Sequence, residues 1–391
     1  MLFESHWPRK IVCGENALSS LSILKIKRAA IVVSGSFRKH NLENWERLIQ
    51  ILDEKAILWR EFQSQGREPT LDFCKKIGLK MCDFAPDAII SIGGGSTLDA
   101  AKAMEIYYEH PDISDTAIAA RFALPKIRTK AQHISIPTTS GTGSEVSPFS
   151  VVSVETGNAE IPYTKMAIAD YQTIPDLVLL DPSLTASMPP SVTAATGMDA
   201  FVHAVESFSS LKPQNPFTDI MALESIKLIF KWLPIAIQEP ENMQARSQMQ
   251  IASTLAGMSL SSRGAGLAHG AGHQIGPAFH LPHGVAVSII LKPVMKLNAS
   301  TRLKEYAQIA YFCGIEAKTD SQAFEALLTK IDMLLDIIKF PRTIGDLGIS
   351  CENFMLKMDF LIPTSLENSA TKANPVIPDA AQMKDIFMTL L

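Results

Sequence analysis

Two short segments of the chain bring together residue types that bind divalent metal ions. Asp199 and His203 are four residues apart, and so are His269 and His273. This interval places each pair on one face of a helix, about one turn apart. His283 follows a proline, where a helix is expected to break, so it can fold back toward the same point. An imidazole-rich set with one carboxylate suits a borderline ion such as iron, zinc or nickel.

A single pair of polar residues at this interval is also typical of a solvated helix face or a helix contact. Two pairs followed by a further histidine favour the metal site. Small residues accompany both pairs and would let helices and a ligand approach closely. These small residues are Ala194, Ala195, Gly197, Ala200, Ala204, Gly264, Gly266, Ala268, Gly270 and Gly272.

A second candidate site lies in the first half of the chain, where the apolar residues 89–92 lead into Gly93, Gly94 and Gly95. A strand, a glycine turn and a helix N-terminus form an anion cradle, because several backbone N–H groups can point at a pyrophosphate. The stretch departs from the common dinucleotide fingerprint, since Leu98 stands where the third glycine belongs. The alternative is a tight turn with no ligand.

A hydroxyl-rich loop follows the next predicted strand. Residues 138–145 hold five hydroxyl side chains and two glycines, which offer hydrogen bonds to ribose, phosphate or a carboxamide. An ordinary Ser/Thr-rich turn is the alternative. Because both loops follow strands of one predicted parallel sheet, they would lie at the same edge, where one dinucleotide could contact both.

The order of the elements predicts two domains. Short strands alternate with amphipathic helices at 42–52 and 70–84, so we expect residues 1–186 to form an α/β domain with a parallel sheet and Rossmann-like dinucleotide binding. Residues 187–391 show helical periods and predict an all-α domain that binds metal and substrate. We expect an irregular segment at 361–378 before a last helix. The predicted strands are 10–13, 29–34, 56–59, 88–92 and 133–136.

Composition excludes several classes of function. Lys and Arg number 36 and Asp and Glu 40, which gives a net charge of -4 and no indication of a nucleic-acid partner. No apolar stretch is long enough to span a membrane, so we expect a cytoplasmic protein. The five cysteines show no CxxC spacing, which fits reduced thiols and argues against a sulfur-ligated metal.

A nucleotide site on one domain and a metal site on the other together indicate hydride transfer. An ion held by Asp199, His203, His269 and His283 would have a position left for the hydroxyl of a substrate and would lower its pKa, while the cofactor accepts hydride from the adjacent carbon. His273 is then the candidate for relaying the proton or orienting the substrate.

Four motifs in this order resemble those of the iron-containing, or group III, alcohol dehydrogenases, whose architecture is shared with dehydroquinate synthase. They lie at 93–102, 137–145, 195–200 and 269–284. The resemblance implies an NAD(P)-dependent dehydrogenase or aldehyde reductase that acts on a small alcohol or aldehyde, with Fe²⁺ or, alternatively, Zn²⁺. It also implies a homodimer or a higher homo-oligomer.

The resemblance also carries residue roles. Asp199, His203, His269 and His283 match the family's metal ligands, and His273 matches an additional active-site histidine. The positions that match the surroundings of the cofactor are Gly94, Gly95, Ser96, Asp99, Thr138, Thr139, Thr142, Ser147 and Lys165.

Two positions depart from the family's pattern. Gly35 stands after the second strand, where members that prefer NAD commonly carry an Asp that grips the ribose and repels a 2′-phosphate. Losing that charge beside Arg38 and Lys39 should permit NADP, so the cofactor is NAD or NADP and we hypothesise use of NADP or of both. Glu68 replaces a usual Asn and cannot donate the hydrogen bonds of an amide.

Alternative functions follow from the same architecture. A metal-dependent lyase of the dehydroquinate synthase type would need several lysines and arginines near the metal, and residues 192–210 and 264–291 contain none. Their apolar side chains, among them Phe201, Phe208 and Phe279, favour a small, weakly charged substrate. A non-catalytic metal- or nucleotide-binding protein is the other alternative. We expect His280 to line the pocket or to pack, and not to bind metal.

Overall fold

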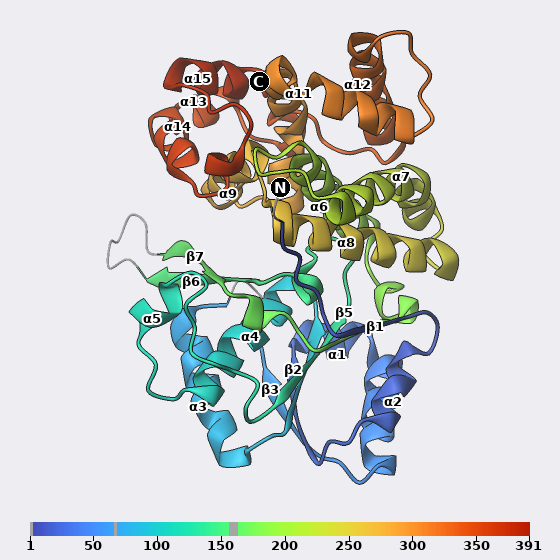
Figure 1. Ribbon diagram of the computed structural model, residues 1–391, viewed down its shortest axis with the longest axis vertical. Coiled ribbons are helices and arrows are strands. Elements are labelled where there is room, and N and C mark those ends of the chain that lie inside the picture. The colour runs from blue at the N-terminus through green and yellow to red at the C-terminus, as the bar shows by residue number, and fades with distance from the viewer. Residues whose placement is uncertain (1–2, 66–68, 156–162) are drawn as a thin grey trace. The chain divides into compact units, whose positions relative to one another are not determined.

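The computed structural model describes residues 3–65, 69–155 and 163–391, and the chain divides into two compact units (Figure 1). One unit is His6–Met188. The other is Pro189–Leu391 together with Met1–Ser5. Contacts explain why the N-terminal residues join the second unit. The Phe3 ring packs edge-on against Phe217 with centroids 6.0 Å apart, and Ser5 Oγ accepts a hydrogen bond of 2.8 Å from Asn215.

The first unit is built on a six-stranded sheet in which every pair of neighbours is parallel. The strand order is β1-β8-β5-β4-β2-β3. The carboxyl ends of β2, β4 and β5 therefore lie next to one another. The strands are β1 (Lys10–Cys13), β2 (Arg28–Val33), β3 (Leu58–Gln63), β4 (Ala88–Gly93), β5 (Gln132–Pro137) and β8 (Leu177–Leu180).

Helices cover both faces of this sheet, as the alternation of β strands with helical periods predicts. Ile31 of β2 packs in one buried cluster with Leu48 of α2 (Leu42–Glu54), while its neighbour Val32 packs in another with Met104 of α4 (Gly95–Glu109). Successive side chains of a strand point to opposite faces, and Figure 1 shows α2 on one side of the sheet and α3 (Leu71–Phe84) and α4 on the other. The unit also contains two short helices, α1 (Gly35–His40) and α5 (Asp115–Ala119).

A two-stranded antiparallel ribbon of β6 (Phe149–Glu155) and β7 (Tyr163–Ala169) was not predicted from the sequence. Neither was β8, because its four residues fall inside the Pro-rich stretch that marked the domain boundary. The predicted strand at 56–59 is β3, which begins later and runs on to Gln63.

A row of buried polar side chains crosses the middle of the sheet. Both ring nitrogens of His133 form hydrogen bonds. Nε2 lies 2.9 Å from Ser91 Oγ, and Nδ1 lies 2.9 Å from Glu105 Oε2. Arg128 forms an ion pair with the same carboxylate. Ser91, His133 and Glu105 are each 0% exposed, so this row cannot meet a substrate and serves to satisfy buried polar groups.

The described residues of the second unit form helices and no strands. Its core is centred on α6, whose Gly197 lies directly against Leu233 of α7. The segment 361–378 was expected to be irregular, yet it begins inside α14, where buried Leu361 and Ser365 hold a helix that contains Pro363. The helices are α6 (Pro190–Ser209), α7 (Pro216–Gln238), α8 (Met243–Arg263), α9 (Leu267–Phe279), α10 (His283–Ile289), α11 (Leu291–Phe312), α12 (Asp320–Ile337), α13 (Cys351–Met355), α14 (Met358–Glu367) and α15 (Ala380–Met388).

All five cysteines are free thiols. Among the helices that the structure describes, none is long and apolar enough to cross a membrane.

Candidate metal centre and cofactor loops

Helix α6 presents the first pair of candidate ligands from a buried position. Asp199 and His203 are 3% and 5% exposed, and His203 Nε2 lies 3.8 Å from Asp199 Oδ1. The interval of four residues puts both side chains on one face of the helix, as the sequence predicts. At the end of α6, the buried guanidinium of Arg263 donates to the backbone carbonyls of Ser207 and Phe208, which satisfies acceptors that a helix C-terminus leaves unpaired.

Helices α9 and α10 bring in three more histidines. Helix α9 ends at Phe279 because His280 takes up a left-handed conformation with φ of 55°, and the amide of Leu281 bonds back to the carbonyl of Gly276 at 2.9 Å. The chain turns, and α10 begins at His283. This turn returns His283 to the centre, with Nε2 3.6 Å from Asp199 Oδ1.

His280 itself is exposed, so the expectation that it packs is wrong, whereas the expectation that it lines a pocket stays a prediction. Its role in the structure is to end α9, since histidine is among the non-glycine residues that tolerate left-handed backbone.

Three imidazoles, those of His203, His269 and His283, converge on one carboxylate oxygen of Asp199. His269 Nε2 lies 3.7 Å from Asp199 Oδ1, which is comparable to the distances of the other two imidazoles. The ligand atoms of Asp199, His203 and His269 all lie within 4.8 Å of one another. His273 stacks on His283 with ring centroids 5.2 Å apart and lies edge-on to His269 at 5.8 Å. The structure thus brings Asp199, His203 and His269 into one group of ligand atoms, and His283 approaches the same carboxylate from a more exposed position.

Close helix packing makes this convergence possible. Gly284 follows His283, and the position where a Cβ would stand falls against the backbone carbonyl of Ala195 in α6. Gly272 of α9 lies in the same way against Val287 of α10, with 2.5 Å from a built Cβ to Cγ1. Side chains at these two positions would push the three helices apart.

Glu206 is a site residue to which sequence reasoning gave no role. Its carboxylate accepts hydrogen bonds from His269 Nδ1 at 2.6 Å, from the amide of Gly266 at 2.9 Å and from the amide of Ala268 at 2.6 Å. Glu206 therefore caps the N-terminus of α9, where negative charge is favourable, and directs Nε2 of His269 toward Asp199. The spacing could have revealed it, because Glu206 follows His203 by three residues on the same helix face.

Electrostatics in the centre follow from these contacts. Burial disfavours the imidazolium form of His269, but the carboxylates of Glu206 and Asp199 outweigh it and raise the pKa of His269 to about 9. Burial likewise favours the protonated form of Asp199, yet His203, His283 and His269 together hold the pKa of Asp199 well below its usual range. A carboxylate so stabilised is ionised at neutral pH.

The candidate cofactor residues of the first unit lie at the neighbouring ends of β4, β5 and β2. Gly93 and Pro137 are partners in the register of β4 and β5, so the two loops that follow start side by side. Built Cβ atoms on Gly94 and Gly95 would lie 3.2 Å from Thr139 Cγ2 and 2.6 Å from Thr142 Cγ2. A side chain at position 95 would displace Thr142, and one at position 94 would be tight against Thr139, so glycine favours this approach of the two loops.

The first turn of α4 follows directly after β4 at this edge of the sheet. Gly94 is the N-cap, and Gly95 and Ser96 are the first helical residues, whose amides have no partner inside the helix. Gly35 opens α1 after β2 and is exposed. Arg38 lies in the same helix and is paired with Glu61 at 2.8 Å.

Other candidate cofactor residues form hydrogen bonds that fix the loop after β5. The Asp99 carboxylate accepts from Ser144 Oγ at 2.5 Å and from the amide of Val151 at 3.0 Å. Buried Lys102 donates to the backbone oxygen of Ser147 at 2.7 Å. Burial lowers the pKa of Lys102 to about 8, although the nearby carboxylate of Asp99 favours the charged form. Lys102 lies in the motif at 93–102, but the sequence analysis gave it no role.

The remaining three candidates take different positions. Thr138 follows β5, and its amide bonds to the carbonyl of Gly93 at 2.9 Å. Lys165 lies on β7 opposite Ser153. Glu68 lies outside the described residues.

The models of known protein families match nearly the whole chain. The model described as iron-containing alcohol dehydrogenase matches residues 8–182, and that of the C-terminal part of the Fe-containing alcohol dehydrogenase family matches residues 193–391. The chain belongs to the iron-containing alcohol dehydrogenase family. It is therefore an NAD(P)-dependent oxidoreductase that catalyses reversible hydride transfer with an alcohol or aldehyde, and the lyase alternative is not favoured.

Several characterised members of the iron-containing alcohol dehydrogenase family resemble the chain. It is 35% identical over 380 residues to an NADPH-dependent butanol dehydrogenase of Clostridium saccharobutylicum, with 97% of this chain and 96% of the relative covered. It is 31% identical to the 1-propanol dehydrogenase PduQ of Citrobacter freundii, with 98% of each covered. The chain spans only 46% of the length of an aldehyde-alcohol dehydrogenase of Clostridium acetobutylicum, to which it is 33% identical.

Solved structures of the iron-containing alcohol dehydrogenase family share the fold. A 1,3-propanediol oxidoreductase superposes with a TM-score of 0.91 at 28% identity, with 100% of both chains covered. A sulfoacetaldehyde reductase of Bifidobacterium kashiwanohense in complex with NAD⁺ gives a TM-score of 0.86 at 26% identity, with 100% of this chain and 99% of that chain covered.

The chemistry of the donor set fits the iron of this family. Asp199 Oδ1 and His269 Nε2 are buried and have no hydrogen-bond partner among the described residues, which would be costly for a centre that held no ligand. Each faces the same point, and the hydrogen bond from His269 Nδ1 to Glu206 fixes the tautomer that leaves Nε2 as a ligand.

Proposed function

We propose that Asp199, His203, His269 and His283 hold one divalent ion, Fe²⁺ in the cell, and that the enzyme reduces small, uncharged aldehydes with NADPH. The observation that carries the metal assignment is the pair of buried, unpartnered ligand atoms, Asp199 Oδ1 and His269 Nε2. The bound ion supplies a Lewis acid for the substrate oxygen.

The chain's own residues then orient the reactants. Glu206 keeps His269 in one ring orientation, and half-buried His273, stacked on His283, is placed to orient the substrate or to pass on a proton. We propose the residues Gly94, Gly95, Ser96, Thr138, Thr139 and Thr142 as the pyrophosphate and nicotinamide contacts, with Asp99, Ser147 and Lys165 beside them.

The absence of lysine and arginine from residues 192–210 and 264–291 supports an uncharged substrate, because nothing there would neutralise an anionic group. The phenylalanines that the sequence analysis placed near the ligands support this less than expected, because they pack inside the helical unit. Phe201 and Phe208 are buried in the helical core, and Phe279 stacks on Phe354 at 5.5 Å.

Use of NADP is supported by Gly35 at the start of α1 and by Arg38 in its last turn. No carboxylate stands at the position that would repel a 2′-phosphate, and Arg38 is half exposed in the same helix. We propose that Arg38 exchanges its pairing with Glu61 for the 2′-phosphate when NADP binds.

We also propose a homodimer or a higher homo-oligomer in the cytoplasm. Family resemblance supports the assembly, and five free thiols fit a reducing compartment.

The decisive experiment is a panel of aldehydes followed at 340 nm with NADPH and with NADH. Butanal serves as the uncharged substrate and sulfoacetaldehyde as the anionic one. We expect kcat/KM to be higher for butanal and for NADPH, and we expect His269→Ala to abolish turnover. His280→Asn is the matched control, because it alters an exposed histidine of the same segment and keeps a residue that tolerates left-handed backbone. A preference for NADH above about a hundredfold, or about 2.7 kcal/mol, would refute the cofactor assignment.

A further inference from the structure

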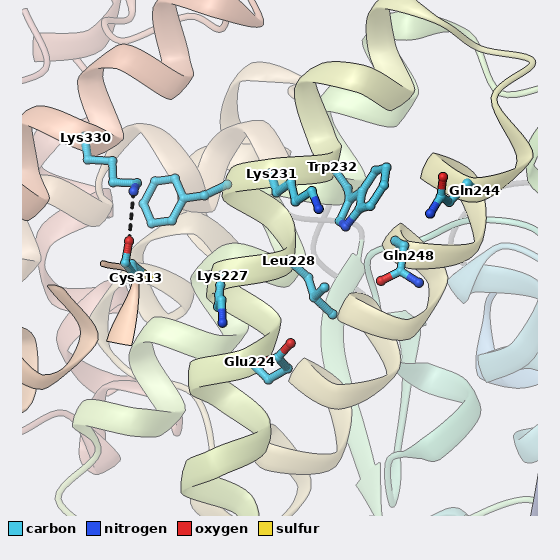
Figure 2. Close-up of a pocket in the computed structure, with 10 residues that line it drawn as sticks. Glu224, Lys227, Leu228, Lys231, Trp232, Gln244, Gln248, Cys313 and Lys330 are labelled. Carbon is cyan, nitrogen blue, oxygen red and sulfur yellow. Dashed lines mark hydrogen bonds between the residues drawn. The ribbon is translucent and has the colours of Figure 1, made fainter. Parts of the chain in front are cut away.

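A hollow on the helical unit lies among residues that neither the metal centre nor the cofactor loops use. Its volume is about 530 Å³, and its walls come from α7, α8, the end of α11 and α12 (Figure 2). This volume is within the range of sites that hold a small organic molecule, roughly 300–1,000 Å³.

The walls carry an excess of positive charge. Lys227, Lys231 and Lys330 line the hollow, and Glu224 is the one carboxylate among the lining residues. None of these three ammonium groups lies within ion-pair distance of a carboxylate in the part of the chain that the structure describes. Lys227 and Lys231 also stand four residues apart on α7, an interval at which like charges mildly destabilise a helix.

Among the described residues, each of the three ammonium groups contacts an aromatic ring and not a carboxylate. The ammonium of Lys231 lies 4.5 Å from the centroid of Trp232, and that of Lys330 lies 5.3 Å from the centroid of Phe230. Lys227 lies 5.3 Å from the centroid of Phe312. Such contacts position a cation and leave its charge uncompensated, so the three amines remain available to an anion.

Hydrogen-bond donors complete the hollow. Figure 2 shows Gln244 and Gln248 of α8 beside Trp232 and Lys231, whereas Lys330 lies toward Cys313, whose backbone oxygen it contacts at 3.1 Å. The side-chain amides can donate to oxygens that are already near the lysines. The arrangement suits a ligand with negative oxygens at one part and an apolar or planar part that contacts the indole.

We propose that this hollow binds a small phosphorylated molecule with at least two negative charges. Lysine acts on phosphate as a point charge and needs no fixed fork geometry. Lys227 and Lys231, one turn apart on α7, and the side-chain amides of α8 offer donors to the several oxygens of a diphosphate or a phosphate ester. This site is separate from the metal ligands, which lie on α6, α9 and α10, and it does not depend on their assignment.

The test uses inorganic pyrophosphate as the probe and the full-length protein with an excess of NADP⁺, which keeps the probe from the cofactor loops. Isothermal titration calorimetry at constant ionic strength should show one saturable site per chain. Lys227→Gln/Lys231→Gln should weaken binding at least tenfold, and Lys227→Arg/Lys231→Arg should restore it to within about threefold. Lys304→Gln/Lys384→Gln removes the same charge from exposed positions on α11 and α15 and should change binding less than twofold.

Fluorescence locates the bound probe. Trp232 is one of four tryptophans, and a change in emission on binding should vanish in Trp232→Phe while the calorimetric site persists. Absence of saturable binding would overturn the proposal. So would equal weakening by the two double glutamine variants, because it would show that the probe responds only to net charge. Wild-type alcohol oxidation by all variants establishes that they are folded.

Discussion

Replacement of Glu206 by glutamine tests how the metal centre is organised. The carboxylate accepts three hydrogen bonds, from His269 Nδ1 and from the amides of Gly266 and Ala268. A glutamine has one oxygen acceptor, and its amide nitrogen can only donate. Glu206→Gln must therefore leave at least one of these donors facing another donor.

The expected magnitude follows from the two contacts that change. Loss of the charge-assisted bond to a ligating histidine typically lowers metal affinity about 10- to 100-fold, or about 1.4–2.7 kcal/mol. A buried amide left without an acceptor costs about 1–3 kcal/mol, so the free energy of unfolding should fall by a similar amount. The fold should survive, because the helices pack through a large apolar cluster.

Competition with a chelator under anaerobic conditions measures the affinity for Fe²⁺, and urea denaturation measures the stability. Glu325→Gln is the matched control, since Glu325 is exposed on α12 of the same unit. An affinity of Glu206→Gln within about twofold of the wild-type value would show that Glu206 does not orient His269, and the account of the centre would have to be revised.

Three further predictions concern other parts of the chain. Gly35→Asp should shift the ratio of kcat/KM for NADPH over NADH at least tenfold toward NADH, because a built Cβ meets nothing within 4 Å and the new charge faces the ribose; an unchanged ratio would remove Gly35 from the cofactor site. Burial keeps the pKa of His133 well below its ordinary value, so the unfolded state binds more protons and stability is lost as the pH falls below about 6.5, by up to about 1.4 kcal/mol per pH unit. Urea denaturation at pH 7.0 and 5.5 should show that His133→Gln loses less stability on acidification than the wild type, and equal losses would contradict this sign. Gly284→Ala should lower stability by about 1–3 kcal/mol and weaken metal binding, because the new methyl group meets the carbonyl of Ala195, whereas Gly276→Ala, with 3.5 Å of space, should behave as the wild type in both assays.

The sequence predicted the fold class and which candidate ligands lie near one another, but it did not predict every element of the fold. Spacings of four residues place Asp199 with His203 on one helix face, and a proline before His283 predicts the turn that returns it. Both inferences are local, and the structure brings these residues together. The spacing of three residues from His203 puts Glu206 on the ligand face, but its role as the partner of Gly266 and His269 was not predictable, because these residues are distant in sequence and meet it only in the folded chain.

The missed strands have a similar cause. Strand β8 has four residues between prolines and aspartates, too few for a clear period, and it forms because β1 and β5 pair with it on either side. The strands β6 and β7 have mixed burial and form a separate two-stranded sheet, with one further bridge from Ser153 to Thr70. Pairing with other strands determines whether such segments form strands, and local propensity does not. The hollow beside α7 could likewise not be predicted from the sequence, since Lys227 and Lys330, which both line it, are far apart in the chain.

Anaerobic titration of the metal-free protein with Fe²⁺, with bound ion and NADPH-dependent reduction of butanal measured in the same samples, tests the central claim most directly. Activity should rise in proportion to bound ion and level off at one ion per chain, and Asp199→Asn should lose both. Full activity without bound ion, or tight binding of one ion by Asp199→Asn, would contradict a centre built on Asp199 and the three histidines.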